Sequence, residues 1–131
     1  MFLTLKYNLK MRNDKENIIV TKTFDFALDI IEFSEDLYEA KRFPLANQIF
    51  KSGTSIGANV REAQNAESKA DFIHKLKIAA KEADETEYWL LLCLKSPFFK
   101  SPNEKLISDL KEIILILSKI ISSSKLKSFS N

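Results

Sequence analysis

Two pairs of polar residues have the types and spacing that chemistry at a shared site would need. Asn59 and Glu62 are three positions apart, as are Glu82 and Glu85, and residues at this spacing share one face of an α-helix. On neighbouring antiparallel helices their carboxylates would converge, as they do in the di-metal sites of helical bundles. Those sites also need Glu-x-x-His pairs, and the single histidine, His74, lies about two turns from Glu82. We therefore predict no catalytic site, no metal site and no cofactor. We interpret these residues as a hydrogen-bonded network that fixes helix register or subunit contacts, or as solvated surface.

The composition indicates one helical domain. The chain has 131 residues, of which 45% are hydrophobic and 29% charged, and this length is enough to bury a core. Two glycines and three prolines leave little material for turns, which favours a few long helices over many short strands. No apolar run is long enough for a membrane helix, and the N-terminus lacks the apolar core of a signal peptide. The single cysteine, Cys93, cannot form an intrachain disulfide, so we expect a cytoplasmic protein with a buried, inert thiol and no membrane partner.

We divide the chain into three parts. Residues 1–20 are predicted to be a flexible leader, residues 21–123 the helical bundle and residues 124–131 a disordered tail. The leader alternates apolar and polar residues as a strand would, but no partner strand is evident in the rest of the chain. Met11 could be the true start as well as Met1.

Start and stop signals place four helices within the bundle. Proline is favoured in the first turn of a helix, and serine or threonine with an acidic residue close behind is a common N-terminal cap. The first expected helix begins with Thr21 or Thr23 as its cap and ends near Lys41, and the second covers residues 44–65. The third covers 69–95, with Ser68 as its cap and Asp71 close behind. The fourth covers 102–122, with Ser101 as its cap and Pro102 at its first position.

The apolar pattern exceeds what one bundle core can bury. The first helix carries two apolar stripes, Phe24, Leu28, Ile31, Glu35 and Tyr38 along one and Phe26, Ile30, Phe33 and Leu37 along the other. In the third helix the inward positions recur every three or four residues, at Leu76, Ala80, Ala83, Glu87, Leu90 and Leu94, and Phe72, Ile73, Ala79, Thr86, Trp89 and Cys93 widen that face. The run Ile113–Leu117 covers every side of the last helix, so part of it must face outward. Exposed apolar patches usually mark interfaces. We predict an all-α, antiparallel up-down-up-down four-helix bundle that assembles further, with Trp89, Ile114 and Ile116 as candidate interface residues.

Both glycines of the chain lie four positions apart in the second predicted helix. A glycine inside a helix costs about 1 kcal/mol relative to alanine, so the pair must provide something in return. Residues four apart share a face, and we predict close helix packing along Ser52, Gly53, Ile56 and Gly57. A phosphate-binding glycine loop is excluded because no Gly-Lys-Ser/Thr follows and no strand precedes.

Four stretches of the sequence read KTFDFA from Lys22, QIFKSGTSIGANVREA from Gln48, SKADF from Ser68 and KEADETEYWL from Lys81. Their order and spacing resemble those of a known family, the bacterial 23S rRNA intervening-sequence proteins, and the likeness covers about residues 20–125. The resemblance implies an antiparallel four-helix bundle, commonly packed as a five-fold ring, with no established enzymatic activity. It also marks recurrent polar positions, which fall here on Gln48, Asn59, Glu62, Glu82 and Glu85.

A related branch, the accessory proteins of diversity-generating retroelements, implies a basic pentamer that binds nucleic acid. Here the net charge of +2 lies entirely in residues 1–20, and the remaining residues sum to zero. Lys69, Lys75, Lys77 and Lys81 are the nearest approach to a basic stripe and are the candidate nucleic-acid contacts, although a solvated face is the simpler interpretation. We expect a non-enzymatic homo-oligomer, with a pentamer as the expected number, that acts as an assembly module. The alternative is an accessory protein that binds RNA through a basic surface of the ring. No small-molecule substrate is expected.

Overall fold

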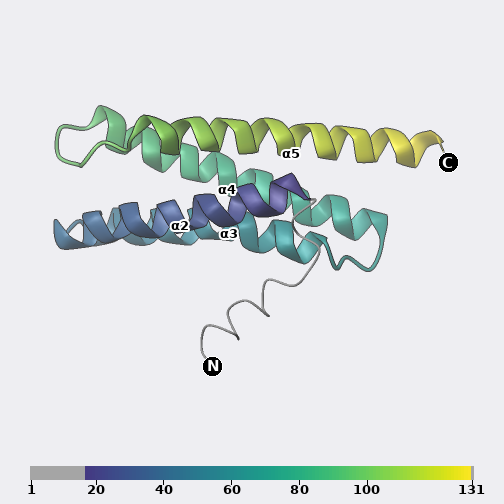
Figure 1. The fold of residues 1–131 in the computed structure, drawn as a ribbon, viewed down its shortest axis with the longest axis horizontal. Helices are drawn as coiled ribbons and strands as arrows, with labels where there is room; N and C mark the ends of the chain where they lie inside the picture. The colour runs from purple at the N-terminus through teal and green to yellow at the C-terminus, as the bar shows by residue number, and fades with distance from the viewer. Residues whose placement is uncertain (1–16, 131) are drawn as a thin grey trace, which may run out of the picture.

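The computed structural model describes residues 17–130, and these residues form four α-helices and no strand (Figure 1). The helices are α2 (Ile18–Glu39), α3 (Phe43–Ala63), α4 (Lys69–Lys95) and α5 (Glu104–Ser130). Residues 1–16, most of the expected leader, lie outside the described part of the chain. The last residues of that leader, from Ile18 onward, are the first turn of α2. None of the four helices is long and apolar enough to cross a membrane.

Each helix packs against two neighbours, and neighbouring helices run antiparallel. α2 contacts α3 and α5, and α4 contacts the same two helices. Residue numbers rise along one helix as they fall along its neighbour, so the predicted four-helix bundle is confirmed. The contacts that show this direction are Gly53–Ile30 and Gly57–Thr23 between α3 and α2, Ser52–Thr86 and Glu62–Lys75 between α3 and α4, and Lys105–Asp29 and Glu112–Lys22 between α5 and α2.

The first helix begins earlier and ends earlier than predicted. It starts at Ile18, whereas we expected Thr21 or Thr23 as its cap. Thr23 is instead fully buried inside the helix, where its hydroxyl donates a hydrogen bond to the Ile19 carbonyl at 2.7 Å. A threonine satisfied in this way can occupy a helix interior. At the other end Lys41 adopts a positive φ of 61°, which ends the helix at Glu39.

The boundaries of α4 match the prediction, but those of α5 do not. The Asp71 N–H donates to the Ser68 hydroxyl at 3.0 Å, which is the expected cap of α4. α5 begins two residues later than expected, because Asn103 rather than Ser101 accepts the Leu106 N–H, at 2.8 Å. It then continues to Ser130, so residues 124–130, expected to be a disordered tail, belong to the helix.

The core is built from one stripe of each helix. On α4 the inward face includes Ala79, Thr86 and Cys93, which are fully buried as predicted, whereas Leu94 of the predicted stripe is exposed. The two stripes of α2 separate cleanly into a buried set and an exposed set. The buried residues of α2 and α4 are Ile19, Val20, Thr23, Phe26, Ile30, Phe33, Ser34 and Leu37, and Leu76, Ala79, Ala83, Thr86, Leu90 and Cys93.

Candidate interaction surfaces

A buried hydrogen bond fixes the register of α3 against α4. The Thr86 hydroxyl lies 2.9 Å from the Ser52 hydroxyl and 2.7 Å from the Glu82 carbonyl, so it can donate to either oxygen. Both side chains are fully buried. Sequence reasoning assigned Ser52 to close packing and did not pair it with Thr86. The available signal was a small polar residue at a core position of each helix, because buried hydroxyls need partners.

The five polar positions of the predicted network are not linked to one another by hydrogen bonds in the described part of the chain. Asn59 donates within its own helix to the Ser55 carbonyl at 2.9 Å, and Glu62 pairs with Lys75 of α4 at 3.3 Å. Gln48 and Glu85 are exposed and Glu82 is partly buried. Apart from the apolar core, the polar contacts between α3 and α4 in the described part of the chain are Glu62–Lys75 and the buried hydroxyl pair.

Glu82 has an altered acidity. Its partial burial raises the pKa of the carboxyl, and repulsion from Glu85 adds to this effect. The positive charge of Lys51 on α3 partly offsets the rise. The shifted pKa thus follows from burial and like charge, and no hydrogen-bond donor bonds this carboxylate within the described residues.

Two groups that could carry chemistry in residues 17–130 are the Cys93 thiol and the His, Asp and Glu side chains. That part of the chain contains no group of three or more His, Cys, Asp or Glu side chains able to hold a metal ion. Burial raises the pKa of the Cys93 thiol to about 11. The thiol is therefore protonated at neutral pH, and the thiolate is the form that reacts or binds metals.

The two glycines allow α3 to approach α2 closely. A Cβ at Gly53 would come within 2.7 Å of the Ile30 side chain, and a Cβ at Gly57 within 3.1 Å of the Thr23 carbonyl oxygen. Ile56, between them on the same helix, is fully buried. Of the four residues predicted to pack closely, Gly53 and Gly57 therefore contact α2, whereas Ser52 contacts α4.

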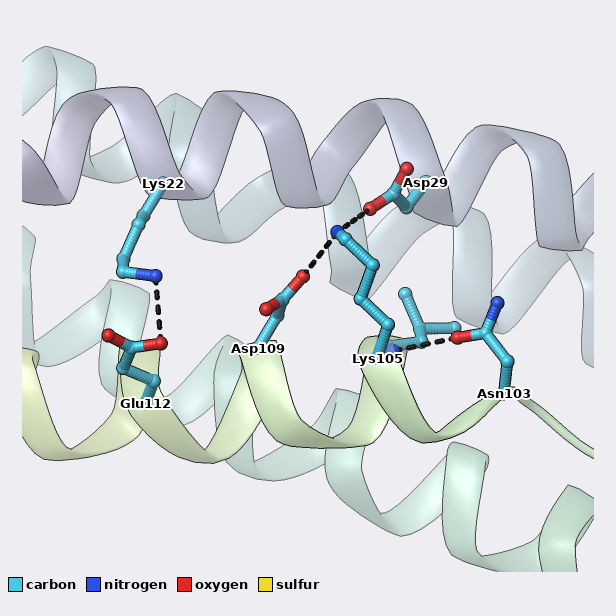
Figure 2. Close-up of polar contacts among 7 residues, drawn as sticks. Lys22, Asp29, Asn103, Lys105, Asp109 and Glu112 are labelled. Carbon is cyan, nitrogen blue, oxygen red and sulfur yellow. Dashed lines mark hydrogen bonds and ion pairs between the residues drawn. The ribbon is translucent and has the colours of Figure 1, made fainter.

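Ion pairs line the seam between α2 and α5, as Figure 2 shows. Lys22 pairs with Glu112 at 2.8 Å, and Lys105 reaches both Asp29 at 3.0 Å and Asp109 at 2.7 Å. The two aspartates raise the pKa of Lys105, Asp109 more than Asp29. A further pair joins Lys100 to Asp36 at 2.6 Å. Because these groups are largely solvated, they orient α5 more than they stabilise it.

An apolar surface faces outward over α2 and α3. We call it the α2–α3 apolar face, and its exposed members are Phe24, Leu28, Ile31, Tyr38, Phe43 and Phe50. The ring centroids of Tyr38 and Phe43 lie 5.4 Å apart, and the Tyr38 hydroxyl donates a hydrogen bond to the Asn47 side chain. Since Gly53 packs on Ile30 and the two helices are antiparallel, Phe50 lies level with the turn of α2 that contains Ile31 and Phe33. All six residues are exposed on these two helices.

The residues predicted as an oligomer interface are less exposed than this face. Trp89, Ile114 and Ile116 are partly buried and pack against the core. The outward member of the Ile113–Leu117 run is Leu115, which is 62% exposed. The indole nitrogen of Trp89 is buried and has no hydrogen-bond partner among the described residues, so the side chain is anchored by packing.

A lysine of α5, Lys125, lies next to the lysines of α4 that were predicted as nucleic-acid contacts. Lys69, Lys77 and Lys81 are exposed, whereas Lys75 is engaged with Glu62. Lys125 lies beside Lys77 and lowers its pKa, since two ammonium groups disfavour each other's charge. Sequence reasoning missed Lys125 because it placed that residue in a disordered tail.

Comparisons with known proteins agree on one family. The family described as 23S rRNA-intervening sequence protein matches residues 15–119. A crystal structure of a protein of unknown function from the S23 ribosomal protein family of Bacteroides thetaiotaomicron is 44% identical in sequence. It superposes with a TM-score of 0.72 and covers 79% of this chain and 97% of its own. A search of curated proteins finds no significant match.

Proposed function

Because the chain belongs to the 23S rRNA-intervening sequence protein family and is similar to a crystallised protein of unknown function, we propose a function from its surfaces. The protein is a non-enzymatic assembly module of the cytoplasm that works as a homo-oligomer, expected to be a pentamer. The observation that carries this proposal is the α2–α3 apolar face.

The size of this face supports a protein partner. Its six large side chains together leave on the order of 500 Å² uncovered, which is at the upper end for a single patch on a monomer. A face of this size provides a large part of the roughly 800 Å² that each partner buries in a standard interface. Water exposure of such a surface is unfavourable, and a second copy of the chain is the partner that is always present.

Light scattering of purified protein tests this proposal. The natural chain should have a mass several times that of one chain. The double variant Ile31→Lys/Phe50→Lys places two charges in the face without touching the core, and we expect it to dissociate while its far-UV circular dichroism stays helical. Leu115→Lys is the matched control, since it replaces an exposed apolar residue on α5, and it should leave the mass unchanged. A monomeric natural chain would refute the proposal.

A second candidate function is RNA binding. It is supported by the exposed lysines of α4 with Lys125 beside them and by the description of the family. Fluorescence anisotropy with a labelled single-stranded RNA at low and moderate salt tests it. Binding that weakens steeply with salt is the expected result, because phosphate contacts release counterions.

A further inference from the structure

The charges of this bundle are sorted along its long axis. We propose that the end formed by the first half of α4 and the last part of α5, which we call the basic end, binds the phosphate backbone of RNA without regard to base sequence. The proposal rests on the second of the two functions above and names the surface that performs it.

The sorting is clearest on α4. Its first half carries Lys69, Lys75, Lys77 and Lys81 against Asp71, whereas its second half carries Glu82, Asp84, Glu85 and Glu87 against Lys95. The same division appears in α5, which packs against α4, and in α2, which packs against α5. From Leu115 to Leu126, α5 contains Lys119 and Lys125 and no acidic residue, and from Asp29 to Glu39, α2 contains five acidic residues and no basic one.

Antiparallel packing adds these charges instead of cancelling them. The start of α4 lies at the same end of the bundle as the end of α5, and the end of α4 lies with the end of α2 (Figure 1). The neutral sum of the bundle therefore conceals a basic end and an acidic end. A local excess of positive charge is what binding to a polyanion requires.

The lysines of the basic end are available to a ligand. Lys77, Lys81, Lys119 and Lys125 are exposed, and none of them forms an ion pair with a described residue. By contrast, Lys22, Lys100 and Lys105 on the α2–α5 seam are all paired with carboxylates. Of the acidic residues near the basic end, Glu62 pairs with Lys75 and Asp71 accepts the Glu67 N–H at 3.2 Å, while the Glu67 side chain is exposed in the loop before α4.

Lys77 and Lys125 bring two like charges together from different helices. Repulsion between them is unfavourable in the free protein, and an anion between the two ammonium groups would relieve it. Phe72, the aromatic residue in the first half of α4, is partly buried and packs against the core. The exposed groups that the first half of α4 presents are mainly lysines, which favours backbone contacts over base recognition.

Fluorescence anisotropy with the full chain and labelled single-stranded RNA of about 20 nucleotides tests the proposal at 50 and 200 mM salt. Four phosphate contacts for each chain predict a logarithmic salt slope of about −2.8, so Kd should rise roughly 50-fold over this range. The variant Lys77→Gln/Lys125→Gln should reduce the slope to about −1.4 and the rise to roughly sevenfold. RNAs of scrambled sequence should bind equally well.

The matched control is Lys95→Gln/Lys111→Gln, which removes the same charge from the other halves of the same two helices. It should bind RNA like the natural chain. Equal losses in both double variants, or no loss in either, would overturn the proposal. The Tm of Lys77→Gln/Lys125→Gln should stay the same or rise, because it removes a repulsion, whereas a fall in Tm with lost binding would indicate a structural role.

Light scattering of the same samples separates this proposal from the assembly function. An oligomer that stays intact and does not bind RNA would refute RNA binding, and the assembly proposal would be unaffected. RNA binding that is lost only in the control variant would retain the function and move the surface away from the basic end.

Discussion

Gly57 of α3 lies directly against the backbone of Thr23 of α2, so that a Cβ at position 57 would stand 3.1 Å from the Thr23 carbonyl oxygen. A helix backbone cannot move aside as a flexible side chain can. This contact therefore limits how closely α2 and α3 can approach each other.

Replacing Gly57 by leucine should separate the two helices. The side chain would need space that the Thr23 backbone occupies, and overpacking of this kind destabilises by about 1–3 kcal/mol. Urea unfolding gives the free energy directly. Ala58→Leu is the control, because it adds the same side chain at an exposed neighbouring position and should change the unfolding free energy by less than about 0.5 kcal/mol. Equal stability of the two variants would contradict the close contact.

Removing either partner of the Ser52–Thr86 hydrogen bond should lower the free energy of unfolding, but by unequal amounts. Thr86→Val leaves the buried Ser52 hydroxyl without its donor and should cost about 1–3 kcal/mol. Ser52→Ala should cost less, since Thr86 keeps its bond to the Glu82 carbonyl. The double variant should be more stable than the sum predicts, by about 1 kcal/mol. Thr54→Val, a partly exposed threonine of α3, should be nearly neutral, and additive effects at positions 52 and 86 would rule out the coupling.

Glu82→Gln should raise Tm at neutral pH. The folded-state pKa of Glu82 is raised, so the folded protein carries an unfavourable charge at every pH above that value. The penalty decreases as the pH falls through the raised pKa and is gone below the ordinary glutamate pKa, where both states are protonated. We expect a gain of about 1–2 °C at pH 7 that vanishes near pH 4. Glu87→Gln is the control, and a gain that persists in acid would argue against titration of Glu82.

Cys93 should resist thiol reagents until the protein unfolds. The side chain is fully buried and its pKa is raised to about 11, so little thiolate is present and access is blocked. An aromatic disulfide reagent should label it slowly in native buffer and fully in urea. The raised pKa also predicts that stability falls as pH rises from the ordinary thiol value toward 11, because the unfolded state loses its proton first. Rapid labelling of the native chain would contradict this burial.

The sequence by itself determined the helices and the class of fold. Ser68 with Asp71 predicted the start of α4, and the scarcity of glycine and proline predicted long helices. These signals are local, since a helix cap and a regular spacing of apolar residues depend only on residues close by in the sequence. The local rules failed where two signals competed: Thr23 looks like a cap but satisfies its hydroxyl inside the helix, and Asn103 took the role expected of Ser101.

Only the tertiary structure decided which faces point outward and which residues meet across helices. The rotation of each helix about its axis depends on contacts such as Gly53 with Ile30, and these join residues far apart in the chain. The exposed stripe of α2, the Ser52–Thr86 bond and the approach of Lys125 to Lys77 all follow from that rotation. The net charge of the bundle likewise did not reveal how the charges are distributed, because a net charge says nothing about where each charge lies. Antiparallel packing places lysines at one end of the bundle and carboxylates at the other.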